Sequence, residues 1–256
     1  MIDPRAIIDP AATLHEGVSV GAFSIIGPDV EIGVGTRVGP HVVINGPTRI
    51  GRDNQIYQFA SIGDAPQDKK YAGEPTRLEI GDRNVIREYC TINRGTVQDQ
   101  GVTRIGDDNW IMAYVHIAHD CQIGNQTIFA NAASLAGHVT VGDYAILGGF
   151  TLVHQFCAIG AHCFCGMGSV ISMDVPPYVM ISGHPAKPHG INSEGLKRRG
   201  LDNNALRALR DAYKIIYKSQ LTLAQAIEQL QALAHDHAEV GVLVNFLQKV
   251  TRGIVR

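Results

Sequence analysis

The residues best suited to chemistry lie in His116-Ile-Ala-His119-Asp120, which brings two imidazoles and a carboxylate within five residues. If Ile117 faces the interior of a strand, alternation sends His116 outward, and His119 and Asp120 approach the following corner. This polar cluster on an outer surface predicts a site at which a histidine removes a proton. A solvated corner or a contact between subunits is the alternative interpretation.

A six-residue period predicts the scaffold that positions this cluster. An aliphatic residue occupies every sixth position from Ile8 to Ile62, and the period resumes over 80–92 and 105–171, where Phe129 and Cys165 take the aliphatic position. Six residues fit neither an α-helix nor a heptad, but they fit a short strand and a corner. Three such units close a triangular coil of about 18 residues. The sequence therefore predicts a mainly β protein with a parallel β-helix over about residues 1–177.

Stacking of successive coils predicts which side chains share the corner with His119. Residues about 18 apart lie above one another, so His119 lies under Gly137 and Gly137 under Gln155, while Asp120 lies under His138. A hydroxyl that attacks a carbonyl carbon needs a base, and the oxyanion that forms needs a hydrogen-bond donor. His119 can be that base, and the backbone N–H of Gly137 can be that donor.

The cysteines and the bulk composition narrow the function further. All five cysteines occupy interior positions of the repeat, so we expect core residues rather than metal ligands or nucleophiles: Cys90, Cys121, Cys157, Cys163 and Cys165. A formal charge of -2 argues against a general nucleic-acid binder. No apolar run is long enough to cross a bilayer, and no signal peptide is recognisable, so we expect a cytoplasmic protein.

The carboxyl end has a different pattern. The repeat stops at 174–177, and the next dozen residues, with Pro185 and Pro188, predict a crossing segment. Helical spacing follows over 202–218, 222–235 and 239–251. We expect a β-helical domain at 1–190, with loop excursions near 64–79 and 94–103, and an α-helical domain at 191–256.

The repeat resembles that of the hexapeptide-repeat acyltransferases, and longer motifs resemble the UDP-N-acetylglucosamine acyltransferases of lipid A synthesis. The repeat implies a left-handed parallel β-helix, a handedness that periodicity alone does not show. The second resemblance covers essentially the whole chain and rests on these segments: Gln58-Phe-Ala-Ser-Ile-Gly63, Gln67-Asp68, Lys70-Tyr-Ala-Gly-Glu-Pro-Thr-Arg77, Asn93-Arg-Gly-Thr-Val-Gln98, His116-Ile-Ala-His-Asp120, Ala136-Gly-His138, Val153-His-Gln-Phe156 and Glu194-Gly-Leu-Lys-Arg-Arg-Gly200.

The resemblance implies a homotrimer without a cofactor that moves a 3-hydroxyacyl chain from acyl carrier protein to the 3-hydroxyl of UDP-N-acetylglucosamine, the first step of lipid A biosynthesis. It makes His119 the general base, supported by Asp120, and Gly137 the oxyanion donor. Direct attack on the thioester then needs no Ser or Cys nucleophile.

Further substrate contacts are implied by the same resemblance. It places Gln67, Asp68, Lys70, His116 and His138 around the sugar, pyrophosphate or acyl group, Gln155 near the nucleotide, and Asn192, Glu194, Arg198 and Arg199 at nucleotide or phosphate. Lys70 and paired arginines suit pyrophosphate, although ordinary surface charge is the alternative for Arg199. Basic helix residues could receive the acidic carrier protein, or form a solvated face: Arg207, Arg210, Lys214 and Lys218.

Met167 occupies a position where some family members with longer chains have Gly. Its side chain would fill space that a growing tail needs, so we expect an acyl chain of about ten carbons rather than about fourteen.

Three competing functions fit the same scaffold. A γ-class carbonic anhydrase would use His116, His119 and His138 as metal ligands, although a spacing of three between the first two departs from that family's pattern. A coenzyme A-dependent acetyltransferase would also suit a β-helix of this kind, and so would a hexapeptide scaffold without catalytic activity.

Overall fold

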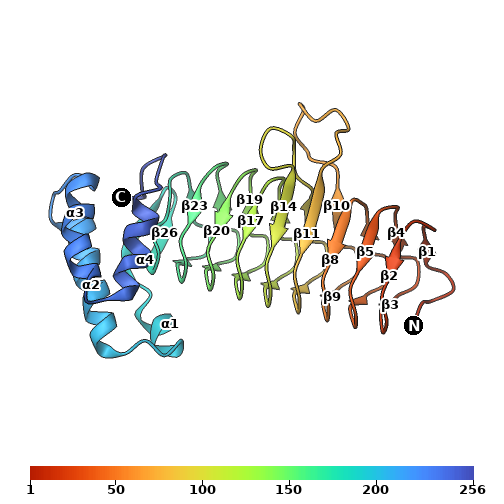
Figure 1. The fold of residues 1–256 in the computed structure, drawn as a ribbon, viewed down its shortest axis with the longest axis horizontal. Helices are drawn as coiled ribbons and strands as arrows, with labels where there is room; N and C mark the ends of the chain where they lie inside the picture. Colours follow the sequence, from red (N-terminus) through yellow and green to blue (C-terminus); the bar gives the residue numbers. More distant parts are fainter.

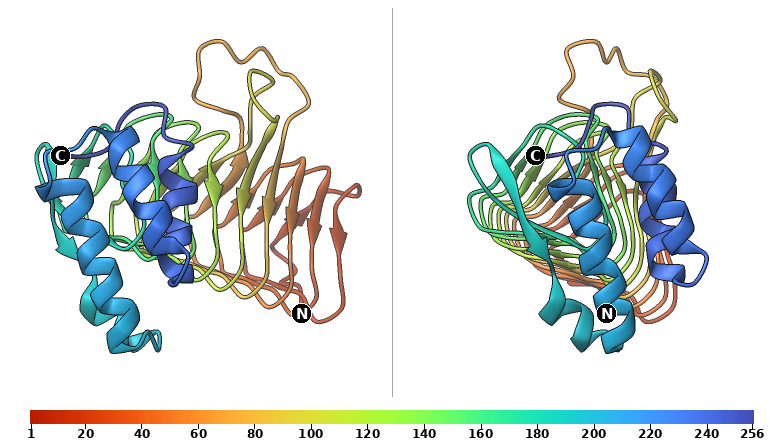
Figure 2. Two further views of the ribbon diagram at one scale, coloured as in Figure 1. Left: turned by 60° about the vertical axis from the view of Figure 1, so that its left-hand side comes forward. Right: turned by 90° about the vertical axis from the view of Figure 1, so that its left-hand side faces the viewer.

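The chain forms a triangular prism of parallel strands with helices at its carboxyl end (Figures 1 and 2), described by a computed structural model of residues 1–256. Each coil contributes one strand to each of three sheets. Sheet 1 contains β1 (Ile7–Ile8), β4 (Ile25–Ile26), β7 (Val43–Ile44), β10 (Ser61–Asp64), β13 (Thr91–Asn93), β16 (His116–Ile117), β19 (Ser134–Leu135), β22 (Leu152–Val153) and β25 (Val170–Ile171).

Sheet 2 contains β2 (Thr13–Leu14), β5 (Val30–Ile32), β8 (Thr48–Ile50), β11 (Arg77–Ile80), β14 (Val102–Ile105), β17 (Gln122–Ile123), β20 (Thr140–Val141) and β23 (Ala158–Ile159). Sheet 3 contains β3 (Ser19–Val20), β6 (Arg37–Val38), β9 (Gln55–Ile56), β12 (Val85–Ile86), β15 (Trp110–Ile111), β18 (Ile128–Phe129), β21 (Ile146–Leu147), β24 (Phe164–Cys165), β26 (Val179–Gly183) and β27 (Ala186–Ile191).

The register confirms the stacking predicted from the period. Ile117 pairs with Leu135, which pairs with Val153, in consecutive strands of sheet 1. These side chains point into the prism and are at most 4% exposed, so burial of one aliphatic column fixes the register. The five cysteines are buried and unpaired, as expected for core residues, and burial raises the pKa of Cys121 to about 12.

Two loops leave the prism where the period is interrupted. One spans residues 65–76 between β10 and β11, and the other spans 94–101 between β13 and β14. Figures 1 and 2 show both projecting from the same edge of the prism, side by side. Backbone hydrogen bonds join Gly95 to Arg77 and Arg77 to Gly101, so the bases of the two loops are tied together.

The segment after the repeat differs from the prediction. Where the sequence predicted a crossing segment, β26 pairs in parallel with β24 and then turns back into the antiparallel strand β27. The prediction relied on Pro185 and Pro188 as breakers and was wrong. Pro185 lies in the turn, and Pro188 is tolerated because β27 is an edge strand with one side free of ladder partners.

Four helices follow the last strand: α1 (Ser193–Arg198), α2 (Asn203–Lys218), α3 (Leu223–Ala234) and α4 (Ala238–Leu247). The sequence predicted the last three and missed the short α1. Asp202 and Thr222 cap α2 and α3. The last helix ends before the predicted residue 251, because the chain turns back to form a bridge between Ile254 and Asp174. No helix is long and apolar enough to span a membrane.

Candidate active site

A cavity of about 830 Å³ lies at the corner between sheets 1 and 2, below the two loops. The coil contributes Ala118, His119, His138, Gln155 and Phe156, and the loops contribute Gln67, Asp68, Lys69, Lys70, Gln98 and Asp99. The structure therefore brings together His119, His138 and Gln155 with the predicted loop residues Gln67, Asp68 and Lys70.

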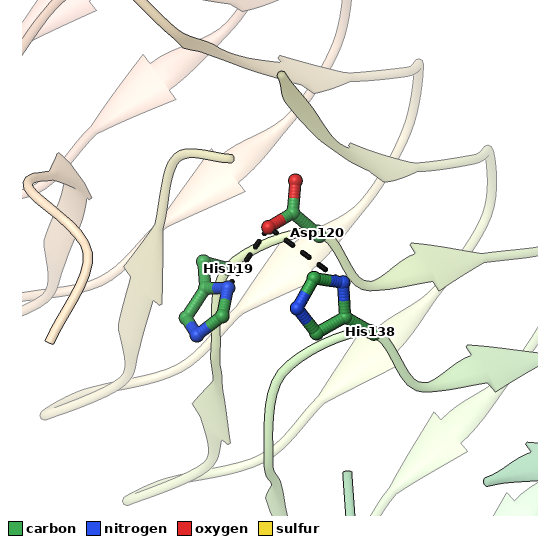
Figure 3. A group of neighbouring side chains, drawn as sticks. All are labelled: His119, Asp120 and His138. Carbon is green, nitrogen blue, oxygen red and sulfur yellow. Dashed lines mark hydrogen bonds and ion pairs between the residues drawn. The ribbon is translucent and has the colours of Figure 1, made fainter. Parts of the chain in front are cut away.

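His119 and Asp120 are hydrogen bonded at the base of this cavity (Figure 3). His119 Nδ1 lies 2.9 Å from Asp120 Oδ2. A proton on Nδ1 would be donated to the carboxylate, which leaves the lone pair of Nε2 free to accept a proton. The pair thus has the geometry of a base and the group that orients it.

Asp120 does not lie on an outer surface, and that part of the prediction was wrong. Its side chain has no solvent exposure, because the 94–101 loop covers it. Thr96 donates its backbone N–H and its hydroxyl to the carboxylate, and the Asp120 N–H is bonded to Thr103 Oγ1. Burial acts to raise the pKa of Asp120, but the hydrogen bonds from His119 and Thr96 outweigh it and leave the pKa below its usual value. Asp120 is therefore ionised near neutral pH.

Gly137 lies directly against the imidazole of His119. A Cβ at this position would come within 2.5 Å of Cε1 and 2.7 Å of Nε2 of that ring. Only glycine at position 137 leaves room for the His119 ring in this position. The Gly137 N–H donates no hydrogen bond within the chain, so it is available to a group bound beside Nε2.

His138 faces the same carboxylate from the next coil. Its Nδ1 lies 3.0 Å from Asp99 Oδ2 and 3.8 Å from Asp120 Oδ2, and its ring is stacked on Phe156 with centroids 4.3 Å apart. His119, Asp120 and His138 are close enough to hold a metal ion. However, Nδ1 of both rings points to one oxygen of Asp120, which also accepts from the Thr96 hydroxyl. The donors fit a hydrogen-bond network better than a set of ligands.

His116 is separated from this cavity and lines an apolar groove of about 470 Å³ on the outer face of sheet 1. Leu152, Val170 and Ala136 form the walls of this groove. His116 Nδ1 lies 2.7 Å from Thr91 Oγ1. Burial, and then the nearby charge of His119, lower the pKa of His116, so the neutral ring is favoured.

Apart from Gln155, the residues predicted to contact the nucleotide or phosphate lie away from this cavity. Asn192, Arg198 and Arg199 line a pocket of about 300 Å³ on sheet 3, the side of the prism opposite the His119 corner. The Arg199 guanidinium lies 4.5 Å from the centroid of the Tyr144 ring and donates to Gln126, whereas Glu194 is exposed and pairs with Lys197. One chain does not bring these residues to His119.

Met167 lies at the third corner, between sheets 3 and 1, and is 83% exposed. It stands above Gly149 and lines neither the His119 cavity nor the groove of sheet 1. The apolar groove of sheet 1 lies between the His119 corner and the Met167 corner.

Sequence reasoning missed Thr96, Asp99 and Phe156 as parts of this site. Thr96 lies in a motif that carried the family resemblance, but no role followed from its spacing because the loop is outside the six-residue frame. Phe156 could have been found from register, since it stacks above His138 in the same column.

Comparison with known proteins identifies the family. A family model described as "Udp N-acetylglucosamine O-acyltransferase; Domain 2" matches residues 174–255, and a bacterial transferase hexapeptide model matches 11–46 and 103–137. The acyl-[acyl-carrier-protein]–UDP-N-acetylglucosamine O-acyltransferase of Thiobacillus denitrificans is 64% identical over 100% of this chain and 99% of its own length. The chain belongs to the UDP-N-acetylglucosamine O-acyltransferase family.

Solved structures of this acyltransferase family have the same fold. LpxA from Acinetobacter baumannii, at 50% identity, and UDP-N-acetylglucosamine O-acyltransferase from Moraxella catarrhalis, at 47%, each superpose with a TM-score of 0.98 over 100% of this chain and 99% of theirs. The likeness confirms the left-handed parallel β-helix followed by helices that the sequence motifs predicted. Membership also confirms that the chain is an acyltransferase rather than a scaffold without chemistry.

Proposed function

We propose that this chain transfers a (R)-3-hydroxyacyl group from acyl carrier protein to the 3-hydroxyl of UDP-N-acetylglucosamine, the first step of lipid A biosynthesis. The substrates are those in the names of its relatives. The observation that carries the proposal is the pair of His119 and the buried Asp120, with Nε2 beside the free N–H of Gly137 in the cavity that the two loops overhang. A cytoplasmic location belongs to the same proposal.

The proposed reaction needs one base and no covalent intermediate. His119 Nε2 accepts the proton of the sugar 3-hydroxyl, and the oxygen attacks the thioester carbon. The Gly137 N–H donates to the oxyanion that forms. When the tetrahedral intermediate collapses, the carbon–sulfur bond breaks, the His119 imidazolium returns its proton to the departing thiolate, and the ester and free carrier thiol remain. Ionised Asp120 stabilises the imidazolium in between.

The sugar nucleotide would be held by residues from both loops and from the coil. Lys70 is exposed at the cavity and offers a positive charge to the pyrophosphate, while Gln67, Asp68, His138 and Gln155 offer polar contacts to the sugar or the nucleotide. No metal or cofactor is required for these contacts.

A homotrimer is part of the proposal, and the position of the second pocket supports a site shared between subunits. Asn192, Arg198 and Arg199 can reach a nucleotide at the His119 corner only if they belong to a neighbouring subunit, because within one chain they lie on the opposite side of the prism. Large apolar side chains exposed on sheets 1 and 3 are consistent with two covered faces: Trp110, Leu152 and Phe164. The site is then shared between subunits.

The acyl chain would occupy the apolar groove of sheet 1. The groove begins beside the His119 corner and is bounded at the far side by the corner that carries Met167. A thioether there limits the length of tail that can be buried, so a chain of about ten carbons is part of the proposal.

The carrier protein would approach the second helix. Arg207, Arg210 and Lys218 are exposed on α2, and an acidic partner would be steered to them at low ionic strength. Lys214, also exposed, is paired with Asp211.

Incubation with UDP-N-acetylglucosamine and a panel of 3-hydroxyacyl carrier proteins, followed by mass analysis, tests the proposal. We expect a 3-O-acyl sugar nucleotide with a preference near ten carbons. Transfer from acetyl coenzyme A alone, or stoichiometric metal in the purified protein with no acyl transfer, would refute it.

A further inference from the structure

Arg94 stands at the base of the 94–101 loop, where its side chain points toward the other loop rather than into solvent. The cavity is lined by Gln98 and Asp99 of the same loop but not by Arg94. Its segment, Asn93–Gln98, is one of those that carry the resemblance to the family, yet Arg94 has no role in the proposed reaction.

The guanidinium of Arg94 contacts three residues that are distant from it in sequence. Nη1 donates to the carbonyl oxygens of Gly46 at 3.2 Å and Gly63 at 3.0 Å. Nη2 donates to the hydroxyl of Tyr71 at 3.0 Å, and the guanidinium carbon lies 5.6 Å from the centroid of the Tyr71 ring. Only a planar fork with several N–H groups can serve acceptors in these different directions.

Tyr71 links Arg94 to the residues that face the cavity. Its hydroxyl donates to the carbonyl of Glu74 at 2.9 Å, and its backbone N–H donates to the carbonyl of Asp68. Lys70 is its neighbour in sequence, and the Lys70 N–H is bonded to the carboxylate of Asp68. The position of Lys70 and Asp68 over His119 therefore depends on where Tyr71 is held.

Asn93 fixes the start of the same loop. Its side-chain amide donates to the carbonyl of Ala65 at 2.8 Å, and the Arg94 N–H donates to the carbonyl of Asp64. Thr96, two residues after Arg94, is the residue that holds Asp120. The 94–101 loop thus contacts the catalytic carboxylate at one point and the substrate-facing loop at another.

We propose that Arg94 is a positioning residue: its contacts with Tyr71, Gly46 and Gly63 hold the 65–76 loop so that Lys70 and Asp68 face the substrate cavity. Arg94 does not touch the reacting atoms. Its loss should weaken binding of the sugar nucleotide while the His119–Asp120 pair keeps its geometry. The kinetic part of this inference rests on the proposed function, whereas the loop restraint itself does not.

Two variants and one matched control test the inference. Arg94→Lys keeps the charge but cannot bridge three acceptors, and Tyr71→Phe removes one hydroxyl while it keeps the ring. Arg83→Lys is the control, since Arg83 makes an equally close bidentate contact, with Asp108, away from the cavity. The measurements are the tryptic cleavage rate after Lys69 and Lys70 in the full-length protein, followed by mass spectrometry, and steady-state kinetics with the carrier-protein donor.

We expect cleavage at these exposed lysines to accelerate several-fold in both variants and to stay at the wild-type rate in Arg83→Lys. The KM for UDP-N-acetylglucosamine should rise by about 5- to 10-fold, with kcat and its pH profile within about twofold of wild type. Unchanged cleavage, or faster cleavage with an unchanged KM, would overturn the assignment. If the wild type transfers no acyl group, the proposed function fails. The role of Arg94 is then tested by the tryptic cleavage rate together with the affinity for UDP-N-acetylglucosamine measured by calorimetry.

Discussion

Thr96 donates two hydrogen bonds to the carboxylate of Asp120, from its backbone N–H at 2.9 Å and from its hydroxyl at 2.6 Å. A buried carboxylate that lacked these donors would favour its protonated form, because burial disfavours charge. The loop residue therefore keeps Asp120 ionised and oriented toward His119. The contact thus connects the 94–101 loop, which interrupts the repeat, to the His119–Asp120 pair, which lies on the repeat.

Replacement of Thr96 by Val tests this contact. The hydroxyl is lost while the shape and the backbone N–H remain, so one charge-assisted hydrogen bond disappears from a buried carboxylate, at a cost of about 1–3 kcal/mol. We expect kcat to fall by about 10-fold or more. Thr127→Val is the matched control, since Thr127 is also buried and its hydroxyl donates to Asn109 far from the cavity. Equal loss of kcat in both variants would show a general packing effect instead.

The general base is tested with His119→Ala. Loss of a positioned base should lower kcat by about 10²- to 10⁴-fold, with little change in the melting temperature because the ring lies at the surface of the cavity. His15→Ala is the control, since the exposed His15 imidazole is bonded to Glu31 of sheet 2, away from the cavity. Full activity of His119→Ala would remove His119 from the mechanism.

Gly137→Ala tests the contact between the glycine and the imidazole. The added methyl would lie within 2.7 Å of His119 Nε2, so the ring must move from its position beside Asp120. We expect kcat to drop by about 10²-fold, the scale typical of a misplaced catalytic group. Gly27→Ala serves for comparison, because its nearest neighbour, Asn45 Oδ1, would be 3.3 Å from the new methyl. A Gly137→Ala enzyme with normal kcat would mean that the observed ring position is not the reactive one.

The scaffold was largely predictable from the sequence, but the surroundings of the site were not. The period of six determines the register, so the column of His119, Gly137 and Gln155 follows from counting. Burial of Asp120 could not be foreseen, because the residue that covers it, Thr96, belongs to a loop outside the period. Likewise, the placement of Arg198 opposite His119 depends on how the chain leaves β27, which no local pattern encodes.

The lowered pKa of His116 predicts a pH dependence of stability. The folded chain favours the neutral ring, so as the pH falls below the usual value of 6.5 the unfolded chain binds a proton that the folded chain does not. The free energy of unfolding should therefore decrease between about pH 7.5 and about pH 5.5. His116→Gln should make that decrease shallower in urea titrations. His162, also shifted downward by burial, contributes in the same sense, so the slope should diminish further in the double variant. A slope identical to wild type would contradict the prediction.

The preferred length of the acyl chain tests whether Met167, although it is exposed in one chain, limits the acyl tail. If the acyl tail runs along the groove of sheet 1 and ends at the corner between sheets 3 and 1, removal of the Met167 side chain opens room for further methylenes, each worth about 0.8 kcal/mol when buried. Met167→Gly should then raise kcat/KM for a donor of about fourteen carbons by about 10-fold or more relative to one of about ten. Competition between the two donors in one reaction, read by mass spectrometry, measures the ratio directly. Met167 is 83% exposed between Gly166 and Gly168 at this corner, so the thioether is the group in position to stop the tail. A ratio unchanged by the substitution would place the end of the tail elsewhere.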